Sequence, residues 1–377
     1  MPVYLDYAAT TSVCPEAVHA ACEAMTEGYG NPSSGYGLGQ EAASALKADR
    51  GVVAEALGCL PEELIFTSCG TESNNWAITA AVKKNRRKGR HIITTAIEHA
   101  AVLEPCKALA AEGYEVTYLK PDRSGHASVE DLTAALRPDT VLVSMMLVNN
   151  ELGTVQPVAE AVRAVKAYDP DILFHTDAVQ GFLKIPVTPS QLGVDLLTVS
   201  GHKIHAPKGI GALYIKKGVK IKGLLLGGGQ EGGLRSGTEP TAQIAAFAAA
   251  CRVGRERFEE NVAAMNGIKE YSLSILSGIP GLEVVSNGEA PHILAVSLPG
   301  YPSQMMVQAL DAEGICVSSG SACHKGKASH VFEALKLPPR VRMGVLRVSF
   351  DTATTREEID TLALALKKIT SERVAAM

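Results

Sequence analysis

Between residues 40 and 217, segments with a helical pattern alternate with short apolar runs rich in β-branched residues. This alternation predicts an α/β fold, because neighbouring parallel strands are joined by crossovers that are usually helices. The runs are apolar throughout, as in a sheet covered on both faces. We therefore expect a large, mainly parallel, seven-stranded sheet built from Leu64–Thr67, His91–Thr94, Glu115–Leu119, Val141–Met146, Ile172–Phe174, Leu196–Val199 and Gly211–Ile215. The helices expected among them are Gln40–Leu57, Glu72–Lys84, Ala101–Ala111, Val129–Leu136 and Val158–Ala167.

The pattern changes after residue 240. An alanine-rich stretch predicts one long helix, Thr241 to about Glu260. A smaller α+β domain is expected after this helix in the sequence, with strands Leu282–Val285, Ile293–Ser297 and Leu346–Phe350 and helices near Ser303–Glu313 and Thr355–Ile369. A chain of 377 residues favours about two domains. We predict a large domain of residues 15–259 and a small domain that combines residues 1–14 with residues 260–377.

Charge and composition exclude several classes of protein. The net charge of −4 argues against a nucleic-acid partner. No apolar run approaches the roughly 18 residues that a membrane span needs, and the N-terminus lacks the basic and apolar regions of a signal peptide. The eight cysteines are scattered and none forms a Cys-x-x-Cys pair, which fits a reducing compartment. We expect a soluble cytoplasmic protein without a membrane contact.

Two polar residues follow predicted strands where ligands bind in open α/β sheets. Lys203 ends the motif Ser200-Gly201-His202-Lys203 after the run from Leu196, and a lysine there can form a Schiff base with a carbonyl cofactor. Asp177 follows Ile172–Phe174, and a buried carboxylate can keep a pyridine nitrogen protonated. These two roles are what a protein must supply to pyridoxal phosphate.

A phosphate group is expected at the start of the helix that follows Leu64–Thr67. Gly70 and Thr71 offer exposed amides and a hydroxyl there, although a plain N-cap is an alternative interpretation. Thr238, in the stretch Arg235-Ser236-Gly237-Thr238, supplies a further donor for phosphate.

Other strand ends carry side chains suited to a planar cofactor and an amino-acid substrate. His99 could stack on a ring and exchange protons, and Gln180 could reach a phenolic oxygen. Asn150 could contact cofactor or substrate, or merely form a turn. Arg347 could bind a carboxylate bidentately through two of its guanidinium nitrogens, and the alternative is a surface ion pair on an edge strand.

Cys323 is the expected nucleophile. It lies in the Ser/Gly-rich run Ser318–Cys323, and His324, Lys325 and Lys327 place positive charge beside it, which favours the thiolate. The glycine-rich segments do not have the spacing of a dinucleotide-binding loop. His202 and His205 have no third ligand nearby, so a metal site is not expected.

In combination these motifs are specific, and the chain resembles the cysteine desulfurases of the class V aminotransferase family, which are fold-type I pyridoxal phosphate enzymes. The resemblance covers nearly the whole chain. The matching segments are Tyr4–Thr11, Gly30–Ser34, Phe66–Ser68, Gly70–Ser73, Glu98-His99, Val148–Gly153, His175–Gln180, Ser200–Lys203, Pro207–Ala212, Arg235–Thr238 and Ser318–Cys323.

The resemblance implies a role for each matching residue. Lys203 would form the Schiff base and move the α-proton, while His99 stacks on the ring. Asp177 would pair with the ring nitrogen and Gln180 with the phenolic oxygen. Cys323 would attack the sulfur of the bound cysteine. The residues implied to hold the phosphate are Gly70, Thr71, Ser200, His202 and, from the other subunit of a homodimer, Thr238; those implied to receive the substrate carboxylate are Asn150 and Arg347.

The resemblance therefore implies conversion of L-cysteine to L-alanine, with an enzyme persulfide as the sulfur donor. A sulfur-acceptor protein is the implied partner, and iron–sulfur assembly on a scaffold protein and tRNA thiolation are both open routes. The enzyme alternatives are selenocysteine lyase and another class V pyridoxal phosphate reaction. An alternative of another class is a non-catalytic sulfur-carrier scaffold, against which the joint presence of Lys203, Asp177 and His99 argues.

Overall fold

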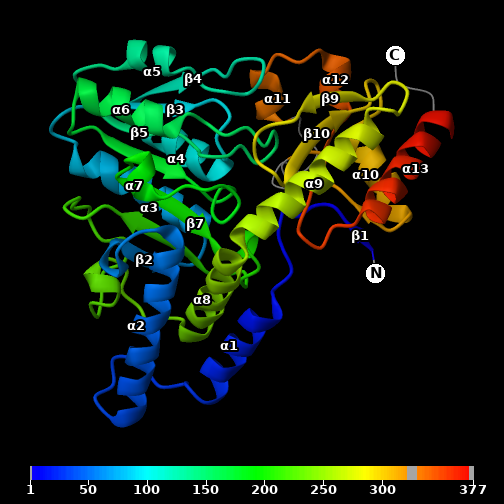
Figure 1. Cartoon of the computed structure of the whole chain (residues 1–377). Helices are drawn as coiled ribbons and strands as arrows, with labels where there is room; N and C mark the ends of the chain where they lie inside the picture. Colours follow the sequence, from blue (N-terminus) through cyan, green and yellow to red (C-terminus); the bar gives the residue numbers. More distant parts are fainter. Residues whose placement is uncertain (1, 321–328, 373–377) are drawn as a thin grey trace.

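The computed structural model describes residues 2–320 and 329–372, and Figure 1 shows its architecture. The large sheet has seven strands in the order β2-β8-β7-β6-β5-β3-β4. They are β2 (Leu64–Thr67), β3 (His91–Thr95), β4 (Glu115–Leu119), β5 (Thr140–Ser144), β6 (Leu173–Asp177), β7 (Leu196–Ser200) and β8 (Gly211–Ile215). Neighbouring strands are parallel except at β8, which runs antiparallel to both β2 and β7. The predicted α/β fold with a mainly parallel sheet is confirmed.

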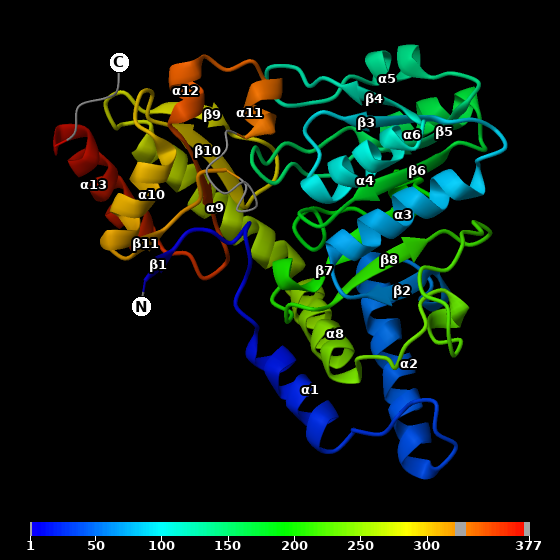
Figure 2. The same cartoon turned by 180° about the vertical axis from the view of Figure 1, so that it is seen from behind.

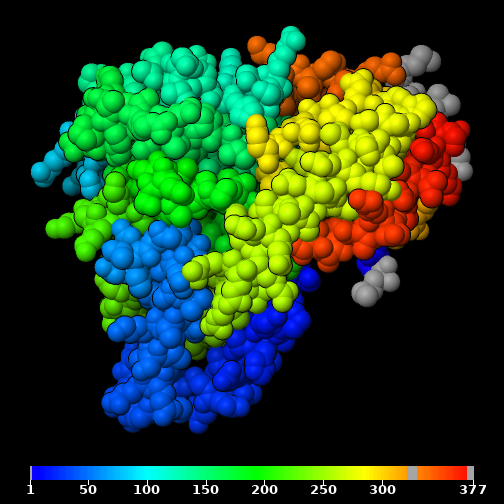
Figure 3. Space-filling view, in the orientation of Figure 1, coloured from blue at the N-terminus to red at the C-terminus, as the bar shows by residue number. Residues whose placement is uncertain are grey.

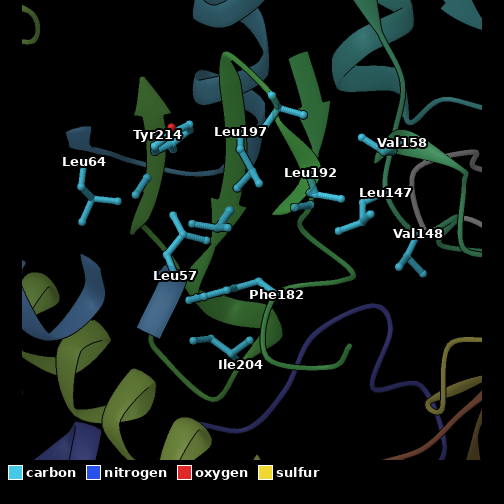
Figure 4. Packing of buried hydrophobic residues seen from close by; sticks show 14 of the residues in the cluster. Leu57, Leu64, Leu147, Val148, Val158, Phe182, Leu192, Leu197, Ile204 and Tyr214 are labelled. Carbon is cyan, nitrogen blue, oxygen red and sulfur yellow. The ribbon is translucent and has the colours of Figure 1, made fainter. Parts of the chain in front are cut away.

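Helices cover both faces of the large sheet (Figures 1 and 2). One apolar cluster holds Trp76 and Val102, from α3 (Gly70–Lys84) and α4 (Ala100–Ala111). The opposite cluster, part of which Figure 4 shows, joins Leu197 and Tyr214 of the sheet to Phe182. The helices that contribute to it are α1 (Pro15–Thr26), α2 (Gly37–Leu57), α5 (Val129–Ala135), α6 (Val158–Tyr168), α7 (Pro189–Leu192) and α8 (Thr241–Glu256). Burial on two faces explains why the strand patterns are continuously apolar.

The long helix predicted from Thr241 to Glu260 is wrong in its extent. The structure has α8, which ends at Glu256, and a second helix, α9 (Phe258–Leu276). Arg257 between them has φ −108° and ψ 18°, outside the helical range. The two helices pack in different places. Phe247 of α8 belongs to the apolar cluster of the large sheet, and Ile268 of α9 belongs to another apolar cluster. No helix in the described part of the chain is long and apolar enough to cross a membrane.

A second, antiparallel sheet has the order β12-β10-β9, with β9 (Glu283–Ser286), β10 (Ile293–Ser297) and β12 (Val345–Ser349). Around it lie α9, α10 (Ser303–Ala312), α11 (His330–Ala334), α12 (Pro339–Met343) and α13 (Arg356–Glu372). The chain's start joins this region, since β1 (Val3–Tyr4) pairs in parallel with β11 (Ile315–Cys316). Leu5 also packs in the same apolar cluster as Val348. The N-terminal segment therefore runs from this region toward the large sheet.

Candidate active site

A cavity of about 240 Å³ opens where the parallel strands end. Residues from the ends of β6 and β7, the starts of α3 and α4, the N-terminal segment and β12 line it. The predicted site residues that it brings together are Gly70, Thr71, His99, Asn150, Asp177, Gln180, Ser200, His202, Lys203 and Arg347. Thr238 is exposed and is not part of the lining, and Cys323 lies outside the described residues.

Lys203 reaches the cavity from the turn η2 (Gly201–Lys203), directly after β7. A Cβ at Gly201 would lie 2.8 Å from Cγ2 of Ile210, so glycine lets this turn pack closely. The Lys203 ammonium donates to the carbonyl oxygens of Ala8 at 2.5 Å and Ala9 at 2.7 Å. The N-terminal segment thus holds the amine at the cavity wall.

Asp177 is the last residue of β6 and is only 6% exposed. Its Oδ1 accepts from the backbone N–H of Val179 at 3.0 Å, and its Oδ2 accepts from the Asn74 amide at 2.6 Å. Both bonds fix the orientation of the carboxylate at the cavity wall. Sequence reasoning missed Asn74, although its position four residues after Gly70 puts both on one face of α3.

The start of α3 and the end of β7 lie side by side at the cavity. The N-cap residue Cys69 makes no side-chain cap, so the plain N-cap interpretation has no support. Ser200 presents a buried hydroxyl without a hydrogen-bond partner among the described residues. Burial, and then the charges of Lys203 and Lys208, lower the pKa of His202 to about 4, so its ring is neutral at pH 7.

Arg347 is 2% exposed, although β12 is an edge strand, so the alternative of a surface ion pair is wrong. Its Nη2 donates to Oδ1 of Asp6 at 2.7 Å, and its Nη1 donates to the carbonyl oxygen of Asn150 at 2.8 Å. Its Nε has no partner among the described residues. A buried guanidinium with an unused donor beside a cavity suits a carboxylate ligand.

His99 and Gln180 are oriented by hydrogen bonds. His99 caps α4, and its Nδ1 accepts from the backbone N–H of Ala101 at 3.1 Å. The Gln180 amide donates to the carbonyl oxygen of Ala8 at 2.9 Å and accepts from Nε2 of His292 at 3.1 Å. Next to His99, Glu98 is fully buried, and this burial raises its pKa to about 8.

Ser318 precedes residues 321–328 and His330 follows them, and both are hydrogen-bonded beside the cavity. Ser318 exchanges backbone hydrogen bonds with Arg347, at 3.2 and 2.7 Å. His330 Nε2 donates to the carbonyl oxygen of Glu98 at 2.9 Å. Cys69 is the described cysteine that lines the cavity.

Residues 3–362 match the family model described as Aminotransferase class-V. A cysteine desulfurase IscS of Dictyoglomus turgidum is 41% identical over 373 residues, which cover 97% of this chain and 94% of that relative. The chain belongs to the cysteine desulfurases of the class-V aminotransferase family. Cysteine desulfurase 2 of Trichormus variabilis is 42% identical over 382 residues, covering 100% of this chain and 94% of that relative. The predicted family is confirmed.

Solved structures agree with this assignment. A structure titled NIFS-like protein has a TM-score of 0.93 and 38% identity, and the match covers 98% of this chain and 100% of that one. A structure titled SspA in complex with cysteine has a TM-score of 0.81 and 34% identity, covering 93% and 99%. The protein is thus a member of a pyridoxal-phosphate-dependent enzyme family.

The residues of the cavity fit this cofactor. The Lys203 amine can bind an aldehyde, and the buried Asp177 carboxylate can bind a protonated ring nitrogen. The unpartnered Ser200 hydroxyl lies near the start of α3, where a phosphate would be favoured. A Cβ at Gly70 would lie 2.9 Å from Cγ2 of Val179 and 3.6 Å from Cβ of Ser200, so glycine keeps this corner open.

Proposed function

We propose that this cysteine desulfurase converts L-cysteine to L-alanine and keeps the sulfur as a persulfide on Cys323. One observation carries the proposal. The Lys203 amine, the Asp177 carboxylate and the Arg347 guanidinium line a single cavity, although they come from η2, β6 and β12. A base, a partner for a ring nitrogen and a carboxylate receptor are the groups that this reaction needs.

Pyridoxal phosphate, when bound, supplies the electron sink that this chemistry requires. Lys203 would hold it covalently, His99 would cover the ring, Asp177 would hold the ring nitrogen and Gln180 the phenolic oxygen. The residues proposed to hold the phosphate are Gly70, Thr71, Ser200, His202 and, from the partner subunit, Thr238.

The substrate would be oriented by its carboxylate, which Arg347 and Asn150 bind. The substrate's amine would displace the Lys203 amine from the cofactor, and the freed Lys203 amine would take the α-proton. The Cys323 thiolate attacks the substrate sulfur, so that an S–S bond forms while the C–S bond breaks. The carbon keeps the electron pair of the broken bond, and a proton returned to it completes alanine. The anchoring of Ser318 and His330 beside the cavity supports this role for Cys323.

A homodimer is supported by an apolar surface. Met25, Tyr29, Tyr36 and Leu226 are 59%, 68%, 63% and 82% exposed. The first three come from the α1–α2 region, which forms a projection at the lower side of the molecule (Figure 3). Large apolar side chains that come from one exposed projection suit an interface with a second copy of the chain.

We further propose a cytoplasmic enzyme whose persulfide is passed to an acceptor protein, such as an iron–sulfur scaffold. The proposed domains are residues 15–259 and residues 1–14 with 260–377. The membership of Leu5 and Ile268 in one apolar cluster supports this division.

The test is product analysis with purified protein, cofactor and L-cysteine. We expect alanine and bound sulfur in equal amounts, without pyruvate. Release of the keto acid of cysteine with its thiol intact, together with conversion of the cofactor to its amine form, would instead identify a transaminase, and activity confined to selenocysteine would identify a selenocysteine lyase. A protein without the cofactor's visible absorbance and without turnover would be a sulfur-carrier scaffold.

A further inference from the structure

His292 is a buried imidazole that no step of the proposed mechanism uses. It precedes β10, is 2% exposed and is not among the residues that line the cavity. Its Nε2 nevertheless lies 3.1 Å from Oε1 of Gln180, which does line the cavity. His292 therefore contacts the proposed cofactor site only through Gln180.

Hydrogen-bond chemistry determines which way the Gln180 amide faces. Its Nε2 lies 2.9 Å from the carbonyl oxygen of Ala8, and a carbonyl oxygen can only accept. The amide nitrogen must therefore face Ala8, and the amide oxygen must face His292. Because that oxygen also only accepts, Nε2 of His292 carries the proton.

The surroundings keep His292 neutral. Its Nδ1 has no partner among the described residues, so none of them would accept a hydrogen bond from a proton on Nδ1. Burial lowers the pKa of His292 well below its ordinary value. The charged groups that act on it are all cations, and they lower it further: Lys184 after β6, Lys269 on α9, Lys203 on η2 and Arg347 on β12.

We propose that His292 is a positioning residue, which holds Gln180 as a hydrogen-bond donor toward the phenolic oxygen of the bound cofactor. The inference rests on the proposed function of the cavity. An amide nitrogen has two hydrogens, and Ala8 takes one of them, so the second is free for the cavity. Without His292 the Gln180 oxygen would be buried without a donor, and the amide would no longer be confined to this orientation.

The chemical consequence concerns the proton on the Lys203 nitrogen. A donor on the phenolic oxygen competes with that protonated nitrogen for the negative charge of the oxygen. Loss of the donor strengthens the attraction between oxygen and proton. The nitrogen of the covalently bound Lys203 should then keep its proton to a higher pH.

The test is a pH titration of the visible absorbance of the cofactor-loaded protein, together with the affinity of the cofactor-free protein for pyridoxal phosphate. In His292→Phe we expect the midpoint to rise by about half a pH unit or more, the size of one lost hydrogen bond. We also expect the affinity to fall several-fold. Gln180→Leu should shift the midpoint equally, and the double variant should shift no further, because His292 acts through Gln180.

Matched variants separate this role from general destabilisation. His292→Gln can keep a donor near the position of Nε2 and should retain the wild-type midpoint. His91→Phe removes another buried imidazole, which lies at the start of β3, is not part of the cavity lining and bonds Thr140 and Thr117. It should lower stability without moving the midpoint.

An unchanged midpoint in His292→Phe, beside a shifted one in Gln180→Leu, would overturn the inference. A wild-type protein that binds no cofactor would instead overturn the proposed function. Should His292→Phe not fold, nitrogen NMR of histidine-labelled wild type decides, because we expect a protonated Nε2 and a bare Nδ1 at neutral pH. A doubly protonated ring, or the opposite tautomer, would rule the inference out.

Discussion

The Asn74 amide donates a 2.6 Å hydrogen bond to Oδ2 of Asp177, and both side chains are buried. This bond joins α3 to the end of β6 at the point where a ring nitrogen is proposed to lie. A carboxylate that accepts from Asn74 and from the Val179 N–H has a single orientation. The relationship therefore supplies a preorganised negative charge in the cavity.

Asp177→Ala should fold, because Asp177 ends a strand at the cavity and is not part of the apolar core. We expect its rate of alanine formation to fall by ~10²-fold or more, as for the loss of a preorganised charge. Steady-state kinetics at saturating cofactor measures this. Asn74→Leu, which keeps the carboxylate, should lose less. Near wild-type turnover of Asp177→Ala with bound cofactor would contradict the proposed role.

Lys203 should be the residue that binds the cofactor covalently. Borohydride reduction of the loaded protein followed by peptide mapping should place the label on Lys203. Lys203→Ala should lose the label and the activity, since the base is gone. Lys208→Ala is the matched control, because Lys208 is exposed in the same loop. A label on any other lysine would refute the assignment.

Cys323→Ala should bind cofactor and cysteine but should neither form alanine nor carry a persulfide, because the attacking thiol is missing. Mass spectrometry after mixing with cysteine should find one added sulfur on the wild-type Cys323 peptide. Cys69→Ala is the control, since Cys69 lines the cavity. Sulfur on the Cys69 peptide, or alanine at the wild-type rate from Cys323→Ala, would defeat the mechanism.

Glu98 should make the free energy of unfolding depend on pH. Burial raises its pKa from 4.5 to about 8 in the folded protein, so unfolding releases a proton between these values. Its contribution to the free energy of unfolding therefore falls as the pH rises from about 4.5 to about 8, by roughly 3–5 kcal/mol. Glu98→Gln should remove this fall.

Urea unfolding of wild type and Glu98→Gln at about pH 5 and about pH 8 measures how far the free energy of unfolding of each protein falls between these two pH values. Glu104→Gln is the control, because the Glu104 side chain is 66% exposed. An equal fall of the free energy of unfolding in wild type and Glu98→Gln would show that Glu98 ionises normally in the folded state.

Thr238 should act in the partner subunit's site. Sedimentation should give twice the chain mass of 39.6 kDa. In a mixed dimer of Lys203→Ala and Thr238→Ala chains, one site has both residues intact if Thr238 acts across the interface. Mixing should therefore restore activity, to about a quarter of wild type for random pairing. No restoration, or an active monomer, would contradict the shared site.

Much of the large sheet could be predicted from the sequence. The bounds of β2, β4 and β8 agree with the predicted runs, because apolar spacing and turn residues are local properties. The positions of Asp177 and Lys203 at strand ends followed from the same patterns. The break at Arg257 did not, since the helical pattern continues through it and only the change of packing partner marks it.

The sequence by itself determined the order of helices and strands and which polar residues stand where the strands end. The tertiary structure decided which distant groups meet. Arg347 pairs with Asp6 across 341 residues, and Gln180 is held between Ala8 and His292. The physical reason is that residue spacing encodes burial along one element, whereas these contacts depend on how the N-terminal segment and the second sheet pack against the large sheet.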